Sequence, residues 1–393
     1  MKSQVPNSDD EDLNIAAHLH LGKHMLQKVK SFGDRINAAT DERMTFNELA
    51  QQSVDIALSL AHIGVKKGDI VAICSSNRME YIPIAFGTLL AGAVLANINE
   101  NKEIIKSDTD IEKTIVFDEP VEGAIHFKDF LSQHASVEDF EATPVNGCED
   151  LAIILFTSGT TGMPKGVRHT HYSFLCSVQD PSIRIPSAEV GSRYYGMTEF
   201  GCICNAKSSR FGYRQGSVGG VRKMFVVKIV DVETREPLGP HQRGEICCKS
   251  PTLLQGYIGG EVDYLDEEGF FKTGDLGYYD EDQYVYVVDR IKDIIKYNCF
   301  AVYPFELEAV LLQHPSVHEV GVVGAPHGEA QELPTAFVVL KPGTQVTEQE
   351  LIDFFNKTVA QNEMQMAGGV RFINELPRGA GLKLDRKKLR SML

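Results

Sequence analysis

A stretch of small residues at positions 157–166, TSGTTGMPKG, has the chemical groups that bind a polyphosphate. Glycine lets the backbone approach a phosphate, hydroxyls and backbone N–H groups donate hydrogen bonds, and Lys165 supplies a positive charge. The stretch follows six apolar residues, Leu151–Phe156, which predict a buried strand. A surface loop without a ligand would have a similar composition, so this stretch alone leaves the function open. The candidate phosphate-binding residues are Thr157, Ser158, Gly159, Thr160, Thr161, Gly162 and Lys165.

The same stretch does not fit the Walker A pattern of P-loop kinases and GTPases. Pro164 precedes the lysine where that pattern requires glycine, and Gly166 follows it where Ser or Thr would bind magnesium. The sequence therefore disfavours a P-loop enzyme.

Further motifs follow in order along the chain. They are YGMTE at 195–199, TGD at 273–275, DRIKD at 289–293, Ile295-Lys296, Pro377-Arg378 and KLDR at 383–386. Together with the TSGTTGMPKGV stretch, they resemble the adenylate-forming superfamily of acyl-CoA synthetases, 4-coumarate-CoA ligases and beetle luciferases. The resemblance extends from about Thr45 to the C-terminus.

This resemblance implies a two-step reaction. The carboxylate of a small-molecule acid attacks the α-phosphate of ATP, which gives an acyl adenylate and pyrophosphate, and the thiol of coenzyme A then displaces AMP. ATP, Mg²⁺ and coenzyme A are the implied cofactors and cosubstrates. Charge builds up as pyrophosphate leaves, so hydrogen-bond donors and a metal must stabilise it.

The resemblance also implies roles for residues of the large N-terminal part. The loop from Thr157 to Lys165 would hold the phosphates, Thr198 would contact phosphate, and Glu199 would help to place Mg²⁺. Asp275 would accept hydrogen bonds from both ribose hydroxyls, because a carboxylate is an acceptor-only group. The other implied nucleotide-binding residues are Tyr195, Gly196 and Arg290.

Two lysines near the C-terminus match lysines of the superfamily that act in different half-reactions. Lys383 matches the adenylation lysine on a mobile C-terminal domain, and Lys296 matches a lysine used in thioester formation, while Lys292 falls at the hinge. Lys383 also belongs to a basic run, and such a run is usually a solvated surface.

The chain departs from the superfamily in length and at single positions. Only 28 residues separate Gly166 from Tyr195, where relatives have a domain-sized region that supplies much of the acyl or aryl pocket. A smaller shortfall lies between Asn99 and Leu151. Leu382, Cys299 and Gln331 replace glycines of the superfamily pattern.

These departures leave two main alternatives open. The chain is either an acid–CoA ligase or a catalytically impaired nucleotide-binding or interaction paralogue that lacks the acyl pocket. A luciferase-like monooxygenase is a third reading, which rests on fold analogy alone.

The elements that would position these residues predict an α/β fold. A capping box at Thr45–Glu48 opens a helix, and a strand over Asp69–Cys74 follows it. The uncharged stretch Tyr81–Asn99 fits a buried helix and strand better than a membrane span.

We predict two domains, at 1–290 and 291–393, with a hinge near 289–293. The first is a large α/β domain, internally shortened near 99–150 and 168–193, and it carries an antiparallel, β-rich subdomain over 221–290. The second is a small, mobile α+β domain. Its predicted elements are a helix at about 304–313, strands at 317–323 and 335–340, and a helix that a capping box opens at Thr347–Glu350.

Composition limits the partners and the compartment. The formal charge of −15 makes nucleic acid a poor partner, because such a surface repels phosphates at long range. Eight cysteines without a CxxC pair predict reduced thiols in an intracellular protein. We expect a cytoplasmic location, with the peroxisome as an alternative because Ser391–Leu393 is similar to the S-K-L address. The sequence makes no prediction of oligomeric state.

Overall fold

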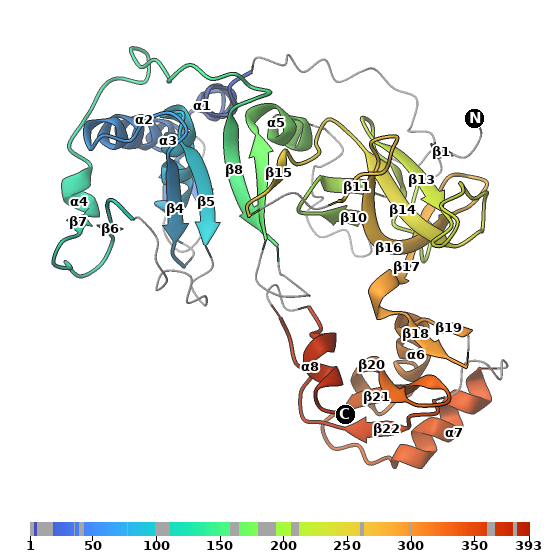
Figure 1. The fold of residues 1–393 in the computed structure, drawn as a ribbon. Coiled ribbons are helices and arrows are strands. Elements are labelled where there is room, and N and C mark those ends of the chain that lie inside the picture. Colours follow the sequence, from blue (N-terminus) through green and yellow to red (C-terminus); the bar gives the residue numbers. More distant parts are fainter. Residues whose placement is uncertain are drawn as a thin grey trace.

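The computed structural model describes residues 4–5, 19–34, 36–38, 43–76, 78–98, 111–157, 165–179, 194–205, 212–259, 263–298, 300–359, 366–379 and 383–393. Figure 1 shows a wide upper part built from two groups of sheets and a smaller part below it, reached through β17. The α/β fold class predicted from the sequence is confirmed, including its β-rich subdomain and its small C-terminal α+β domain.

The N-terminal group is a five-stranded sheet with helices packed on it. The strands in spatial order are β15 (Gly256–Tyr257), β9 (Gly166–Thr170), β8 (Leu151–Phe156), β5 (Val94–Ile98) and β4 (Ile70–Cys74). Strands β4, β5 and β8 are parallel, whereas β9 and β15 pair antiparallel. The helices are α1 (Leu21–Lys30), α2 (Phe46–His62), α3 (Tyr81–Leu90) and α5 (His171–Gln179).

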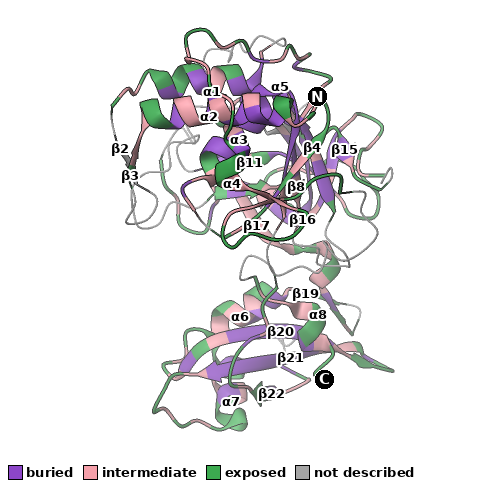
Figure 2. Ribbon diagram, turned by 90° about the vertical axis from the view of Figure 1, so that its left-hand side faces the viewer, coloured by how far each residue is buried: buried purple, intermediate pink, exposed green. Residues whose placement is uncertain are grey.

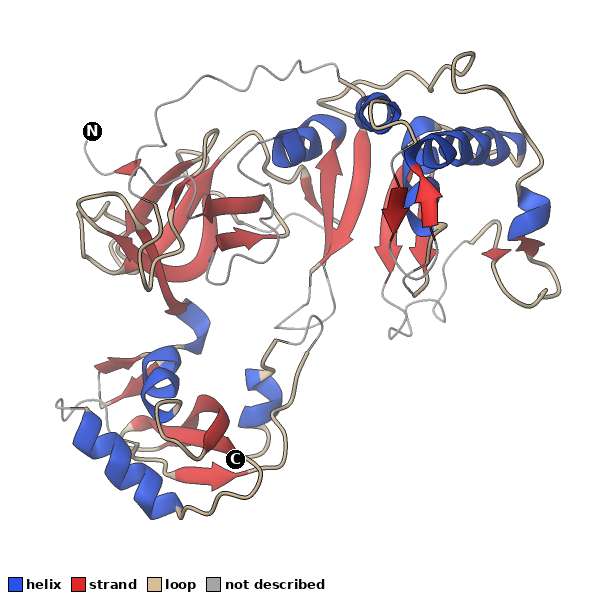
Figure 3. Cartoon of the chain, turned by 180° about the vertical axis from the view of Figure 1, so that it is seen from behind, coloured by secondary structure: helices blue, strands red, loops and turns tan. Residues whose placement is uncertain are grey.

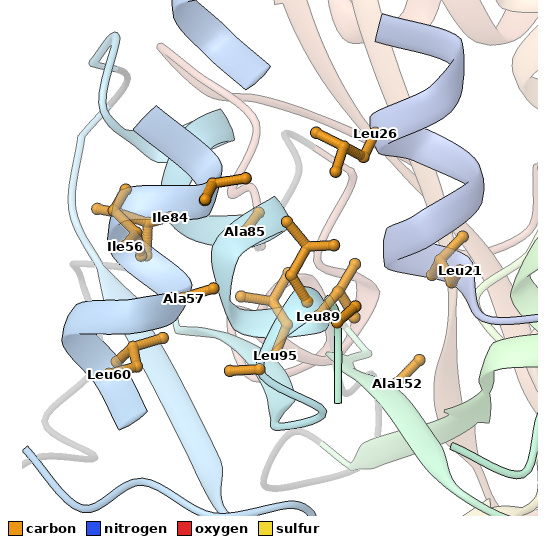
Figure 4. Close-up of a cluster of buried hydrophobic side chains, with 14 of the residues drawn as sticks. Leu21, Leu26, Ile56, Ala57, Leu60, Ile84, Ala85, Leu89, Leu95 and Ala152 are labelled. Atoms are coloured by element: carbon orange, nitrogen blue, oxygen red, sulfur yellow. The ribbon is translucent and has the colours of Figure 1, made fainter. Parts of the chain in front are cut away.

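The interface between these helices and the sheet forms the largest core (Figure 4). Leu89 of α3 and Leu60 of α2 are both buried there. The predicted capping box at the start of α2 is present, with both of its hydrogen bonds. Helices α2 and α3 approach each other so closely at Gly87 that a Cβ there would lie 2.5 Å from a methyl group of Ile56. The buried helix and strand predicted within Tyr81–Asn99 are therefore confirmed, and no helix of the described residues is long and apolar enough to cross a membrane.

The β-rich subdomain contains two antiparallel sheets that share one core. The first consists of β1 (Gln4–Val5), β13 (Val226–Val230), β14 (Gly244–Lys249), β16 (Phe271–Tyr279) and β17 (Val285–Arg290). The second consists of β10 (Tyr194–Met197), β11 (Gly201–Asn205) and β12 (Gly220–Val221). Phe200 and Phe271 stack edge to face between them. The antiparallel pairing predicted for 221–290 is confirmed.

The small part below has its own sheet and core. Its strands in spatial order are β19 (Phe300–Val302), β18 (Ile295–Tyr297), β21 (Gln331–Leu340) and β20 (Val317–His327), with β22 (Val370–Phe372) parallel to β21. Its helices are α6 (Pro304–Leu311), α7 (Glu348–Thr358) and α8 (Arg386–Arg390). Figure 2 shows the buried residues of this part gathered along β20 and β21.

The remaining elements are short. They are β2 (Ile36–Ala38), β3 (Arg43–Thr45), β6 (Ile115–Val116), β7 (Ile125–His126), α4 (Phe127–Phe130) and the 3₁₀ turn η4 (Ile291–Asp293). Figure 3 shows β17 running through η4 into the small part, at the place where the sequence predicts a hinge.

Two residues of the large part, Asp289 and Arg243, contact the small part near this turn. The Asp289 carboxylate accepts a hydrogen bond from the backbone N–H of Phe305 in α6 (3.0 Å). Arg243, in the hairpin between β13 and β14, forms an ion pair with Glu306 of α6 (2.8 Å). Its guanidinium also lies 5.0 Å from the centre of the Tyr303 ring.

Candidate active site

A buried carboxylate, Asp275, lies at the centre of the candidate site. Its Oδ2 accepts a hydrogen bond from the hydroxyl of Tyr195 on β10 (2.8 Å), and its Oδ1 lies 2.7 Å from Nε of Arg290 on β17. Asp275 and Arg290 are direct partners in the antiparallel register of β16 and β17, so the sheet itself brings the two charges together. The structure thus unites three residues that the sequence predicted separately.

The local conformation of the TGD motif explains its residue types. Gly274 has a φ of +70°, a conformation that favours glycine, and its N–H donates to the buried carboxylate of Glu245 (2.9 Å). The backbone N–H of Asp275 donates to the hydroxyl of Thr273 (3.0 Å), which itself donates to the carbonyl of Ile246 (2.6 Å). These bonds fix the point at which the Asp275 side chain leaves β16.

The environment of Asp275 balances opposing effects on its pKa. Burial raises the pKa of this carboxyl, while the charge of Arg290 and the Tyr195 hydrogen bond lower it. The net direction is upward. Each oxygen has one partner among the described residues, and a carboxylate has about four lone-pair positions. The remaining acceptor capacity fits a ligand that presents two hydroxyl donors, such as a ribose.

A second buried carboxylate, Glu199, follows the YGMT residues of the 195–199 motif. Its Oε1 accepts a hydrogen bond from the hydroxyl of Tyr257 on β15 (2.8 Å), and its carbonyl accepts one from the N–H of Leu254 (2.9 Å). The carbonyl of the preceding residue, Thr198, lies 2.9 Å from Nε2 of His169. Burial lowers the pKa of His169, so the imidazole is neutral at pH 7 and its Nε2–H donates to this carbonyl.

Steric crowding explains why the same motif has a glycine at position 196. A Cβ at Gly196 would lie 2.3 Å from the carbonyl oxygen of Gly201 in the neighbouring strand β11. No side chain fits this gap without moving the strand. Gly196 therefore contributes close strand packing, which sets the position of Thr198 and Glu199.

The base of the predicted phosphate loop lies beside these groups. The N–H of Thr157 donates to the carbonyl of Lys165 (3.0 Å), and the N–H of Lys165 donates to the Thr157 hydroxyl (3.2 Å). The exposed Lys165 ammonium lies 5.3 Å from the centre of the Tyr257 ring. The predicted phosphate-binding residues Ser158, Gly159, Thr160, Thr161 and Gly162 lie outside the described residues.

The C-terminal part contributes Lys383 to the same site. The positive charge of Lys383 lowers the pKa of Asp275, although burial and the charge of Arg290 have larger effects on that carboxyl. Lys383 is exposed and lies on a narrow hairpin in which the N–H of Gly379 donates to the Lys383 carbonyl (2.8 Å). The convergence of Asp275 and Lys383 on one nucleotide stays a prediction, and the effect of the Lys383 charge on Asp275 is consistent with it.

The hairpin is anchored on its own domain by Arg386. Its guanidinium pairs with both carboxylate oxygens of Glu308 on α6, and Nη1 donates to the carbonyl of Val322 on β20 (2.7 Å). Asp293 of η4 adds weaker ion pairs to Arg386 (3.9 Å) and to Arg390 (3.5 Å). The position of Lys383 thus depends in part on a half-buried ion pair three residues away.

Other predicted positions lie elsewhere. Lys296 is exposed on β18, its backbone N–H donates to Glu332 (2.8 Å), and no contact of its side chain with the Asp275 cluster occurs within the described ranges. Gln331, which replaces a glycine of the superfamily pattern, has a φ of +63°, so glycine would be the easier residue there. Leu382 and Cys299 lie outside the described residues.

The site residues fit a magnesium ion bound mainly through a substrate. Within the part of the chain that the structure describes, no group of three or more His, Cys, Asp or Glu side chains could hold a metal. Mg²⁺ commonly uses one or two protein carboxylates and completes its shell with phosphates and water. Glu199 suits this pattern, because Oε2 accepts no hydrogen bond from the described residues while Oε1 is fixed.

Comparisons with known proteins decide the family. The family model "AMP-binding enzyme" matches residues 26–192 and 184–258, and the model "AMP-binding enzyme C-terminal domain" matches 306–381. The chain belongs to the AMP-binding enzyme family. The resemblance to adenylate-forming enzymes found in the sequence is confirmed.

Relatives and solved structures agree with this family. The chain is 28% identical to luciferin 4-monooxygenase of Luciola mingrelica over 98% of its own length and 95% of the relative's. It is 27% identical to 4-coumarate–CoA ligase of Pinus taeda, over 97% and 96% of the two lengths. The crystal structure of the anthranilate CoA ligase AuaEII with anthranoyl-AMP has the same fold, with a TM-score of 0.85, 19% identity, and coverage of 96% of this chain and 98% of that one.

Two residues at the candidate site were not predicted from the sequence. Tyr257 and His169 both hold the Thr198–Glu199 segment in place, although neither lies in a motif with recognisable chemistry. Tyr257 follows a glycine in a short strand, and His169 lies inside a strand that reads as ordinary core. Their roles arise from the pairing of β15 with β9, which a single sequence does not reveal.

Proposed function

We propose that this chain is an ATP-dependent, AMP-forming acid–CoA ligase, which activates a small-molecule carboxylate as an acyl adenylate and transfers the acyl group to coenzyme A. One observation carries the proposal. Tyr195 and Arg290 hold the buried Asp275 in the large part, and the charge of Lys383 from the C-terminal part also lowers the pKa of that carboxyl. A two-domain convergence on one carboxylate is what an enzyme needs to grip a nucleotide and act on its phosphate.

Each residue would then contribute a definite step. Asp275 accepts the ribose hydroxyls, Lys165 offers its charge to the phosphates, and Glu199 offers Oε2 to Mg²⁺. The metal, when bound, would neutralise charge as pyrophosphate departs. Lys383 would stabilise negative charge on the oxygens around the α-phosphate during attack by the carboxylate. Lys296 is proposed for the thioester half-reaction, because its present position is away from Asp275.

A second candidate is favoured by the length of the chain. The alignment with the Luciola relative spans 524 positions, whereas this chain has 393 residues, so a domain-sized part of the relative has no counterpart here. The family model also matches in two segments that meet at residues 184–192, inside the gap that the sequence predicts at 168–193. We therefore keep a catalytically impaired nucleotide-binding paralogue as the alternative.

Carboxylate-dependent release of pyrophosphate separates the two candidates. The purified chain would be given Mg·ATP with short-chain, long-chain and aromatic acids, and pyrophosphate would be measured with and without coenzyme A. A ligase releases pyrophosphate with at least one class of acid and forms a thioester only when coenzyme A is present. Binding of ATP without pyrophosphate release for any acid would favour the impaired paralogue.

The location in the cell is a further part of the proposal. We propose a cytoplasmic protein, with peroxisomal import through Ser391–Leu393 as the alternative. Arg371 donates a hydrogen bond to the backbone oxygen of Leu393 (2.9 Å), so these residues would have to detach before an import receptor could bind them. Imaging of an N-terminally tagged chain with and without these three residues would test the alternative.

A further inference from the structure

We infer that Tyr257 is a positioning residue for magnesium binding: it holds one oxygen of Glu199 so that the other faces the metal. The inference rests on the function proposed above, because it takes Glu199 as the metal-binding carboxylate. Tyr257 itself touches neither the nucleotide nor the metal in this account. It acts through the carboxylate that it orients.

The strand that carries Tyr257 is fixed on both sides of this residue. The N–H of Gln255 donates to the carbonyl of Arg168 (2.8 Å), and the N–H of Ile258 donates to the carbonyl of Gly166 (2.8 Å). Strand β15 is therefore locked to β9, on the side of the sheet that faces β10 and β11 (Figure 1). The Tyr257 ring also packs edge to face against Tyr264, with ring centres 5.5 Å apart.

The backbone around Glu199 is fixed as well. His169 holds the carbonyl of Thr198, and the N–H of Leu254 holds the carbonyl of Glu199. What remains free is rotation of the Glu199 side chain about its own bonds. The hydroxyl of Tyr257, 2.8 Å from Oε1, removes that freedom. Because Oε2 has no hydrogen-bond donor among the described residues, it is the oxygen left for a cation.

The ring of Tyr257 has a second contact that links the two halves of the phosphate site. The ammonium of Lys165 lies over the ring face, 5.3 Å from its centre. One aromatic side chain thus supports both the lysine proposed for the phosphates and the carboxylate proposed for the metal. The hydroxyl serves Glu199 and the ring face serves Lys165, so the two roles can be separated by substitution.

The test measures ATP affinity by calorimetry with and without Mg²⁺, which needs no turnover. In Tyr257→Phe we expect the Mg²⁺-dependent gain in ATP affinity to fall roughly tenfold, while affinity without Mg²⁺ stays at the wild-type value. Tyr257→Leu, which also removes the ring, should additionally weaken ATP binding without Mg²⁺ by about twofold to fivefold. Tyr264→Phe is the matched control, since it removes a neighbouring hydroxyl that has no contact with Glu199, and should keep the full gain.

Several outcomes would overturn the inference. The first is that Mg²⁺ increases the ATP affinity of Tyr257→Phe as much as that of the wild type. The second is that Tyr264→Phe loses as much of this increase as Tyr257→Phe does. The third is that Mg²⁺ does not increase the ATP affinity of the wild type. Glu199→Gln provides a second test. By itself it must abolish the Mg²⁺-dependent increase in ATP affinity, and it must reduce that increase by a smaller factor when Tyr257→Phe is already present.

Failure of the proposed function gives a different result. The wild type would then release no pyrophosphate with any acid and yet show an Mg²⁺-dependent gain that Tyr257→Phe reduces.

Discussion

The two parts of the molecule hold their site residues in opposite ways. In the large part, Asp275 is 4% exposed and is fixed by the register of two long strands, by Arg290 across the ladder and by Tyr195 from another sheet. In the small part, Lys383 is exposed, and side-chain contacts hold its hairpin, such as the ion pair of Arg386 with Glu308. The first arrangement is rigid because two paired strands build it, whereas the second depends on the side-chain contacts of one short hairpin.

Because of this difference, we assign nucleotide binding to the large part and the reaction at the phosphate to Lys383 of the small part. A buried carboxylate in a fixed sheet can recognise the nucleotide in every state of the enzyme. A lysine on a hairpin of another domain can arrive for one step and leave for the next, at the cost of breaking contacts such as those of Asp289 and Arg243. The following predictions test whether the two parts divide the work in this way.

Lys383→Ala should have the largest effect. We expect the rate of adenylate formation to fall roughly 10² to 10³-fold, because a charge aimed at the reacting phosphate is lost, while ATP affinity changes less than threefold. Pyrophosphate release and calorimetric titration with ATP measure the two quantities. Lys387→Ala, from the same basic run on α8, is the matched control and should leave both unchanged. Equal losses in the two variants would mean that the run acts only as a charged surface.

Arg386→Met should damage the anchor without touching the lysine. It leaves the half-buried Glu308 without a cationic partner, which we expect to destabilise the small part by about 3 kcal/mol and to lower adenylate formation through misplacement of Lys383. Chemical denaturation and pyrophosphate release would measure this. The double variant Arg386→Met/Glu308→Leu removes both charges and should recover much of the stability while adenylation stays low. Full recovery of both would show that Lys383 needs no such anchor.

Asp275→Asn tests the rigid half of the comparison. An amide still accepts one hydrogen bond but carries no charge, so we expect ATP affinity to fall roughly tenfold to a hundredfold. Catalysis at saturating ATP should fall less. Asp263→Asn, at an exposed carboxylate paired with Lys272, serves as the control. A loss in catalytic rate with unchanged ATP affinity would reverse the roles assigned to Asp275 and Lys383.

The sequence alone could predict the elements and the motifs, because both depend on local patterns. The capping boxes at Thr45 and Thr347 and the strand before the phosphate loop are present as predicted. Strands β20 and β21 were predicted too short, since their ends, at Pro326–His327 and Gln331–Leu333, pair only because the two strands form one long hairpin. Propensity does not show such an extension.

What the sequence could not supply is pairing between distant elements. Tyr257 lies 58 positions from Glu199 and belongs to a two-residue strand, so no spacing rule connects them. The sequence also does not predict that His20 and His171 lie together, with their ring centres 5.0 Å apart. Both depend on which strands and helices become neighbours, and that is settled by long-range packing.

Because of this histidine pair, the large and small parts should also differ in their stability against unfolding at acid pH. His20 and His171 are buried among α1, α5 and the loop before β8, and burial lowers the pKa of each from 6.5 to about 4. Lys23 and Lys67 lower these pKa values further, and Asp150 raises that of His171. Because the folded pKa values lie below those of the unfolded chain, their contribution to stability is complete above pH 6.5 and is lost as the pH falls toward 4.

The large part should therefore unfold first in acid. At pH 5.5 we expect its stability to fall by about 1 kcal/mol per buried histidine relative to pH 7.5, whereas the histidines described in the small part are exposed or half-buried and offer no such cause. Scanning calorimetry at the two pH values, with limited proteolysis to identify the part that opens, would measure this. His62→Gln, an exposed site on α2, should leave the acid sensitivity intact. Earlier opening of the small part in acid would show that the small part, and not the buried histidines of the large part, limits the acid stability of the molecule.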